Sequence, residues 1–274
     1  MFTRTLTNII TAAFLALSPG VGTSQNLISL DDIAKVTVIP GWRTDTGTHI
    51  AAIRIEMAEG WKTYWRSAGE SGITPRFDWS GSDNLQNVQI HWPIPKVFDP
   101  ETSRSYGYKG TVVIPVELTP QNSNAQTISM RARMDIGVCE EVCVPMTVNL
   151  QAELPASGSS EPSIQASLAH QPTTAKTAGL HSATCTVEPI SDGLRVSANF
   201  DLPDQGGVEI VVFELPDKSV WIDEAQSTRS GRHLTAITDF VPPSGAPFLF
   251  NRSDLRMTVF GSNGTVDIQG CTAG

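Results

Sequence analysis

Strict alternation of hydrophobic and other residues is the most regular pattern in this sequence. In residues 127–136 every second residue is hydrophobic, and the same period continues through residues 144–150. A period of two is typical of strands with one buried face, because successive side chains of a strand point to opposite sides of the sheet. The two runs therefore predict a β-hairpin. The end of this hairpin carries two cysteines, Cys139 and Cys143.

Shorter runs of the same kind predict that most of the chain consists of strands. They fall at residues 51–57, 61–65, 77–79, 88–92, 112–118, 194–200, 208–213, 255–259 and 266–268. Asn263-Gly264, between two of these runs, is a strong hairpin signal. Apart from a short stretch at residues 30–36, no segment has a helical period. Many short strands at close spacing predict an all-β fold of immunoglobulin-like β-sandwich type.

A change in composition predicts where this fold is divided. Residues 155–182 are rich in Ser, Ala, Thr, Pro and Gln and contain no aromatic residue, which is typical of a linker. A helical turn is expected within it, near residues 163–170. The sequence thus predicts two domains, a first sandwich over residues 25–154 and a second, smaller sandwich over residues 183–274.

The N-terminus has the three parts of a secretory signal peptide. Arg4 is followed by an apolar run at residues 9–17 and then by small residues up to Ser24. We expect a signal peptide over residues 1–24, cleaved within residues 21–25; an uncleaved anchor is the alternative. The apolar run is short for a membrane span, and no later segment approaches one. The mature protein is therefore expected to be soluble and periplasmic, where disulfides persist.

Charge and histidine spacing argue against two classes of ligand. The net charge is −9 and there is no basic run, which disfavours nucleic acids and anionic lipids as partners. The five histidines lack the spacing of metal ligands. We therefore expect no nucleic-acid partner and no histidine metal site.

Four cysteines allow three disulfide connectivities, and one of them keeps each pair inside one predicted domain. It joins Cys139 to Cys143 and Cys185 to Cys271. A Cys185–Cys271 bond would close a loop of about 86 residues and contribute roughly 4–5 kcal/mol in the chain-entropy model. Because it would tie the start of the second domain to its end, we interpret this pair as structural.

The Cys139–Cys143 pair has a different character. Its loop is so short that loop closure contributes much less stability, and strained or exposed disulfides are the easily reduced ones. Glu140 and Glu141 lie between the cysteines, and their negative charge disfavours a thiolate. That arrangement suits a thiol that reacts only when a partner docks. The alternative is a disulfide that merely staples the hairpin.

Several motifs occur in a fixed order through the first domain. They are Gly60-Trp61-Lys62-Thr63-Tyr64-Trp65, Gly69-Glu70-Ser71-Gly72-Ile73-Thr74-Pro75, Trp92-Pro93-Ile94-Pro95, Tyr106-Gly107-Tyr108-Lys109-Gly110 and the cysteine hairpin at residues 139–145. Together they resemble the N-terminal periplasmic domain of the thiol:disulfide interchange protein DsbD family, and more closely its ScsB-like members. The second domain contributes little to this resemblance.

The resemblance implies an immunoglobulin-like domain that relays electrons and needs no cofactor. The donor would be a membrane DsbD/CcdA-like thiol transporter or a thioredoxin-like protein, and the acceptors would be periplasmic substrate proteins that contain disulfides. The chain would then be a component of a protein-disulfide reductase. Since it has neither a later transmembrane segment nor a thioredoxin-like Cys-x-x-Cys, we expect its membrane partner to be a separate polypeptide and the protein itself to be a monomer.

The resemblance also assigns roles to residues. Cys143 matches the cysteine that forms mixed disulfides, and Cys139 would resolve them. A cap over the pair is best matched by residues 96–108, with Phe98 as the shielding aromatic. The other candidates for the cap or for lining the site are Tyr64, Tyr106 and Tyr108.

Two other functions are compatible with the cysteine hairpin. Copper binding is one, because Met134 and Met146 lie near the cysteines and soft sulfur ligands favour Cu(I). The alternation, however, places both methionines on the core face of their strands, where methionine commonly fills gaps. The other is a structural adaptor made of two disulfide-stapled sandwiches.

Overall fold

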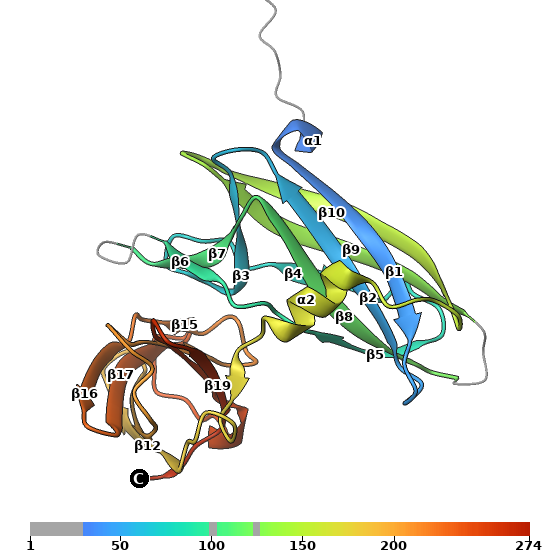
Figure 1. The fold of residues 1–274 in the computed structure, drawn as a ribbon. Helices are drawn as coiled ribbons and strands as arrows, with labels where there is room; N and C mark the ends of the chain where they lie inside the picture. Colours follow the sequence, from blue (N-terminus) through green and yellow to red (C-terminus); the bar gives the residue numbers. More distant parts are fainter. Residues whose placement is uncertain (1–29, 99–102, 123–126) are drawn as a thin grey trace, which may run out of the picture.

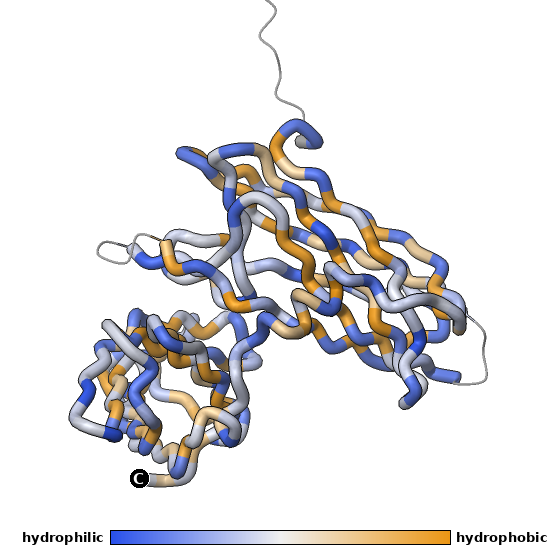
Figure 2. The backbone as a smooth tube through the Cα atoms, in the orientation of Figure 1, coloured by the Kyte–Doolittle hydropathy of each residue, from blue (hydrophilic) through white to orange (hydrophobic). Residues whose placement is uncertain are grey.

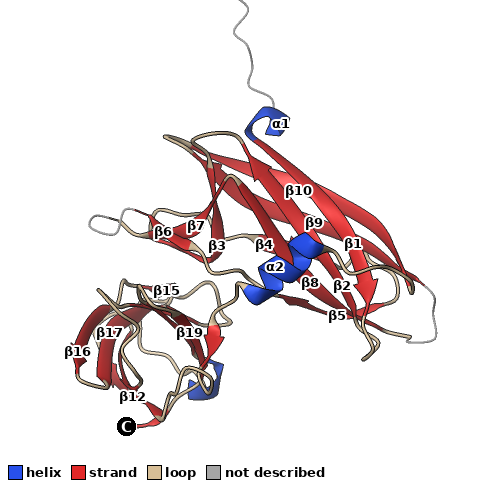
Figure 3. Ribbon diagram, viewed as in Figure 1, coloured by secondary structure: helices blue, strands red, loops and turns tan. Residues whose placement is uncertain are grey.

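The computed structural model describes residues 30–98, 103–122 and 127–274 (Figure 1). The expected signal peptide, residues 1–24, lies outside the described residues, as do residues 99–102 of the expected cap. None of the helices in the described part of the chain has the length and apolar character needed to span a bilayer. Strands make up most of this part, as expected for an all-β protein (Figure 3).

Two sheets form the N-terminal half. The first has the strand order β1-β2-β8-β5, with bounds β1 (Ala34–Arg43), β2 (His49–Met57), β8 (Thr111–Pro120) and β5 (Leu85–Ile90). The second has the order β10-β9-β3-β7-β6, with β4 paired to β9; the bounds are β10 (Cys143–Pro155), β9 (Thr127–Cys139), β3 (Lys62–Gly69), β7 (Ser105–Lys109), β6 (Lys96–Phe98) and β4 (Arg76–Asp78). A short helix, α1 (Leu30–Ile33), precedes β1.

The predicted hairpin of alternating residues is β9 and β10. They pair antiparallel without a register shift, from Cys139 opposite Cys143 to Thr127 opposite Pro155. The hydrophobic residues of β9 face the core between the two sheets, and its polar residues face outward. Hydrophobic and hydrophilic positions also alternate along parts of other strands of this domain (Figure 2). The expected immunoglobulin-like sandwich is thus confirmed for the first domain.

The C-terminal half is a second, smaller β-sandwich. One sheet has the order β11-β19-β18-β14, with bounds β11 (Thr173–Thr174), β19 (Thr265–Gln269), β18 (Arg256–Phe260) and β14 (Ile210–Glu214). The other has the order β15-β17-β13-β12-β20, with β16 paired to β17; the bounds are β15 (Trp221–Ile222), β17 (His233–Val241), β13 (Leu194–Asp201), β12 (Ser182–Pro189), β20 (Thr272–Ala273) and β16 (Gln226–Ser230). A short 3-10 helix, Arg252–Asp254, precedes β18.

The segment at residues 155–182 is more ordered than the composition alone predicts. It forms α2 (Pro162–Ala169), which lies across the first domain beside β8 (Figure 1). Ile164 of α2 is fully buried in a cluster with Ile50 and Ala52 of β2. The Ser167 hydroxyl donates a hydrogen bond to the Val113 carbonyl at 2.5 Å. Strand β11 then pairs with β19 of the second sandwich, so this segment contacts both halves.

The two sandwiches share a packed interface. Phe260 of β18 packs edge-on against Trp65 of β3 and stacks on Tyr106 of β7, with ring centroids 5.5 Å apart in each pair. Arg66, the next residue of β3, reaches into the second sandwich and donates to Glu214 at 2.9 Å and to the Thr258 hydroxyl at 2.9 Å. These aromatic contacts and the buried ion pair hold the second sandwich against β3. In its sheet, β3 lies next to β9 of the cysteine hairpin.

Candidate redox site

The disulfide Cys139–Cys143 closes the end of the β9–β10 hairpin. Cys139 is the last residue of β9 and Cys143 the first of β10, so they lie directly opposite each other with Cα atoms 4.1 Å apart. Residues 140–142 form the connection. The disulfide therefore joins two positions that the β9–β10 ladder already holds opposite each other.

The two sulfur-bearing residues differ sharply in their access to solvent. Cys139 is only 2% exposed and packs against Tyr64 and Ala68. Cys143 is exposed, and so is the neighbouring Val142, at 71%. An incoming partner therefore meets Cys143 first, whereas Cys139 is reached through Cys143.

Tyr64, one of the expected lining residues, lies against the disulfide. Its side chain is 1% exposed, and its hydroxyl oxygen is 3.6 Å from the Cys143 sulfur and 3.5 Å from the Ser71 carbonyl oxygen. A phenol has one proton to donate. The hydroxyl can therefore donate either to the carbonyl or to the sulfur, and a thiolate on Cys143 would be the stronger acceptor.

A loop that the sequence did not single out as part of the site, residues 69–75, covers Tyr64. Two glycines allow this close approach. A side chain on Gly72 would collide with Tyr64 and Ala68, and one on Gly137 of β9 would place its Cβ 2.5 Å from that of Ile73. In the sequence, Gly137 could have indicated this contact, because a glycine inside a strand often marks a place where other atoms approach the backbone closely.

Charged side chains surround the pair. Glu140 lies over Gly60, where an added Cβ would meet the glutamate Oε1 at 2.1 Å. Gly60 also has a φ of +88°, which a residue with a side chain adopts only with strain. Lys62 stands opposite Cys139 in the β3–β9 ladder. The two negative charges between the cysteines, on Glu140 and Glu141, thus have one positive charge nearby, the ammonium group of Lys62 on β3.

Phe98, the expected shielding aromatic, is half-buried at the end of β6. Two ammonium groups lie near its ring, with Lys62 Nζ at 5.0 Å and Lys109 Nζ at 5.5 Å from the ring centroid. Lys62 therefore connects Phe98 to the position opposite Cys139. The shielding role expected for Phe98 stays a prediction.

The other two tyrosines make their contacts elsewhere. Tyr106 stacks on Phe260 in the interface, and the Tyr108 hydroxyl donates to the Pro93 carbonyl at 2.8 Å. Burial raises the pKa of both phenols above the ordinary value. Both are therefore neutral packing residues of the first sandwich and its interface, and the structure brings only Tyr64 of the expected tyrosines to the Cys143 sulfur.

The remaining sulfur atoms lie in different surroundings. Cys185 of β12, 1% exposed, is bonded to Cys271 just before β20. Met134 and Met146 are buried in the core, on the face of the hairpin opposite to the cysteines. Within the described residues, no group of three or more His, Cys, Asp or Glu side chains is placed to hold a metal ion.

The fold and the site define a class: a tandem β-sandwich protein with a disulfide at a hairpin end, one of its cysteines buried and the other exposed. Residues 25–155 match the family model of the N-terminal domain of thiol:disulfide interchange protein DsbD. The first domain is therefore a DsbD-like N-terminal domain.

A solved structure extends the likeness beyond this domain. The N-terminal periplasmic domain of ScsB from Proteus mirabilis matches with a TM-score of 0.66 over 90% of this chain and 97% of that chain, at 21% sequence identity. At this identity the match establishes the shared fold, which includes the second sandwich. No curated protein sequence matches the chain.

Proposed function

We propose that the protein exchanges thiols and disulfides through Cys139 and Cys143. It would pass electrons from a membrane thiol transporter or a thioredoxin-like donor to disulfide-containing substrate proteins in the periplasm. The observation that carries this proposal is the unequal burial of the two cysteines, 2% exposure for Cys139 against an exposed Cys143. A staple would gain nothing from one accessible sulfur, whereas an exchange reaction requires it.

The forward reaction begins with the reduced pair. The Cys143 thiolate attacks one sulfur of a substrate disulfide, forming a mixed disulfide and releasing the other substrate sulfur as a thiolate, which takes up a proton. The Cys139 thiol then loses its proton, and its thiolate attacks the Cys143 sulfur. The Cys139–Cys143 disulfide forms and the second substrate thiol leaves, so two electrons pass from the pair to the substrate.

The donor restores the pair by the reverse sequence. A thiolate of a reduced donor dithiol attacks the exposed Cys143 sulfur and displaces Cys139 as a thiolate. The second donor thiol then resolves that mixed disulfide, so the donor becomes oxidised and the pair is reduced. Both half-reactions use the same exposed sulfur.

Tyr64 and Lys62 favour the charged form of the attacking sulfur. The Tyr64 hydroxyl, 3.6 Å from the Cys143 sulfur, can turn from the Ser71 carbonyl to donate to a thiolate. The ammonium group of Lys62, on the strand beside Cys139, acts against the negative charge of Glu140 and Glu141. The periplasmic location is supported by the ScsB neighbour, which is a periplasmic domain.

Single-cysteine variants test the proposal. Cys139→Ala and Cys143→Ala are each reduced mildly and mixed with a thioredoxin-fold protein whose single remaining active-site cysteine carries thionitrobenzoate. Attack by the variant releases thionitrobenzoate, and the adduct is resolved on a non-reducing gel and by mass spectrometry. We expect Cys139→Ala to accumulate the adduct, and Cys143→Ala to form at least about ten-fold less because its remaining thiol is buried.

The wild type is the control, because its adduct should be resolved by Cys139 and should not accumulate. Adducts formed by Cys143→Ala alone would reverse the two roles. If neither variant forms an adduct, the disulfide is a structural staple and the proposed function is wrong.

A further inference from the structure

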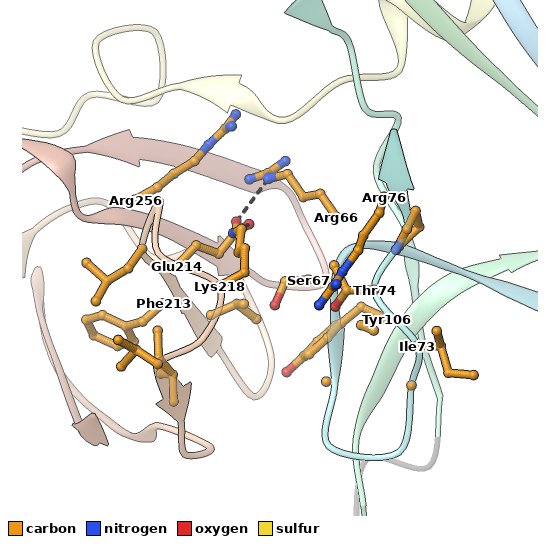
Figure 4. Close-up of a pocket in the computed structure, with 18 of the residues that line it drawn as sticks. Arg66, Ser67, Ile73, Thr74, Arg76, Tyr106, Phe213, Glu214, Lys218 and Arg256 are labelled. Carbon is orange, nitrogen blue, oxygen red and sulfur yellow. Dashed lines mark hydrogen bonds and ion pairs between the residues drawn. The ribbon is translucent and has the colours of Figure 1, made fainter. Parts of the chain in front are cut away.

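A cleft of about 1300 Å³ lies between the two sandwiches. Its first wall comes from residues 66–77 and from Pro145–Thr147 of β10, and its second wall comes largely from residues 211–225 (Figure 4). The ion pair between Arg66 and Glu214 spans the two walls. Both side chains are less than 10% exposed, so the spacing of the walls is set by a buried contact.

The cleft and the disulfide share one face of the same sheet. Cys143, Pro145 and Thr147 are alternate residues of β10 and are all exposed, so they point to the same side. Pro145 and Thr147 line the cleft. Two residues of a strand span about 6.6 Å, so the Cys143 backbone lies one such step beyond the end of the cleft.

Exposed apolar side chains mark the path between them. Ile73, 36% exposed, and Trp221, 52% exposed, line the cleft from its two walls. Val142, 71% exposed, stands on the connection between the cysteines. A chain that ran through the cleft toward Cys143 would bury apolar surface of each of these residues, and burial of apolar surface is favourable.

Strand edges also face the cleft. Among the described residues, β14 pairs only with β18, β15 only with β17 and β4 only with β9, and all three contribute lining residues. An edge strand presents backbone N–H and C=O groups that an added extended chain can pair with. A small thiol compound could use neither these edges nor the full volume, which exceeds that of usual small-molecule sites, roughly 300–1,000 Å³.

We propose that this cleft binds an extended polypeptide segment of the redox partner, adjacent to the partner cysteine that exchanges with Cys143. The inference rests on the proposed exchange function and adds to it a recognition site shared by the two domains. Trp221 of β15 and Ile73 contact apolar side chains of the segment, and the strand edges hold its backbone. The second sandwich thereby contributes directly to choosing the partner.

The test compares three thionitrobenzoate mixed disulfides, all with the same leaving group. One is N-acetylcysteine amide, and the other two are ten-residue peptides of apolar and β-branched residues, with the cysteine at the first or at the last position. The protein is reduced only at Cys139–Cys143, and the release of thionitrobenzoate in a single turnover gives a second-order rate constant for each probe. We expect one of the peptides to react at least ten-fold faster than the single residue.

Trp221→Ala should reduce that advantage at least five-fold while leaving the rate with N-acetylcysteine amide unchanged. The matched control is Leu249→Ala, which removes a 99% exposed side chain that does not line the cleft and should change neither rate. A serine version of the faster peptide should compete with it in the wild type, which tests the site without any substitution.

The outcomes separate the two proposals. Equal rates for the peptides and N-acetylcysteine amide, or a Trp221→Ala effect of the same size on all probes, would overturn the cleft as a recognition site and leave the exchange function intact. A wild type that does not react even with N-acetylcysteine amide would instead overturn the exchange function.

Discussion

Cys139–Cys143 joins neighbours across one hairpin, whereas Cys185–Cys271 joins positions 86 residues apart. The first bond has one exposed cysteine and stands beside Tyr64; the second has Cys185 at 1% exposure within the core of the second sandwich. The two bonds are chemically identical, so the different uses proposed for them must come from loop length and surroundings.

The comparison shows that stability and reactivity are separate properties of a disulfide. Loop closure acts on the unfolded chain and grows with the length of the loop. Reactivity depends on whether a thiolate can reach one of the sulfur atoms in the folded protein. In this chain the long loop is closed by the buried Cys185 and the partly buried Cys271, whereas the short loop carries the exposed Cys143, so each bond is suited to one role.

The largest effect that would test this comparison is on stability. Replacing Cys185 and Cys271 together by alanine should lower the free energy of unfolding of the second sandwich by about 4–5 kcal/mol, because the unfolded chain regains the entropy of a long loop. Replacing Cys139 and Cys143 together should cost only about 2 kcal/mol by the same relation. Urea unfolding followed by circular dichroism measures both, and equal losses for the two pairs would contradict the assignment.

The next largest effect is the loss of stability expected when the interface between the two sandwiches is weakened and both disulfides are kept. Arg66→Ala should destabilise the protein by about 3 kcal/mol, because it leaves Glu214, 5% exposed, buried without its main partner. This loss of stability is at the lower end of what removing one partner of a buried ion pair usually costs, because Lys218 Nζ remains 3.6 Å from Glu214. Both disulfides should form normally in this variant.

The matched control for Arg66→Ala is Arg195→Ala, which removes an ion pair with Asp239 whose arginine is 51% exposed. Exposed pairs contribute at most about 1 kcal/mol, so this change should be small. If the two variants lose the same stability in urea unfolding, the interdomain ion pair does not hold the sandwiches together.

The smallest effect concerns access to the short disulfide. Phe98→Ala removes a ring that contacts Lys62 and Lys109, contacts worth about 1 kcal/mol in total. Oxidation of the reduced Cys139–Cys143 pair by a small oxidant should become about five-fold faster, the rate ratio that such an energy corresponds to. Stopped-flow measurement of thiol loss gives this rate.

Phe248→Ala is the control for Phe98→Ala, since Phe248 is a partly buried ring of the second sandwich. It should leave the oxidation rate unchanged. A Phe98→Ala rate equal to that of the wild type would mean that Phe98 does not shield the pair.

The sequence was sufficient for the fold class and for the cysteine hairpin. Alternation along residues 127–136 and 144–150 predicted which residues of β9 and β10 face the core, because a strand has only two faces. The motifs around Tyr64 and the cysteines predicted that the first domain resembles the N-terminal domain of DsbD, and the match over residues 25–155 confirms this resemblance. Local pattern and short-range motifs carry this information.

Contacts between distant residues could not be predicted in the same way. The unequal burial of Cys139 and Cys143 depends on Tyr64 and on the loop that carries Ile73, and no periodicity encodes how a loop folds back. The cleft depends on Arg66 meeting Glu214, which lie 148 residues apart in the chain. Tyr106 was expected near the site from its motif, but its ring stacks on Phe260 of the other sandwich.

Helix α2 has a practical consequence for anyone who wishes to produce the domains separately. A fragment that ends at Pro155, where the family match ends, would lack the helix that buries Ile164 against Ile50 and Ala52. It would also lose the hydrogen bond from the Ile94 amide to the His170 carbonyl at 2.9 Å. The uncovered apolar face of β2 would then promote aggregation. The smallest fragment of the first sandwich that keeps its surface closed therefore extends to His170.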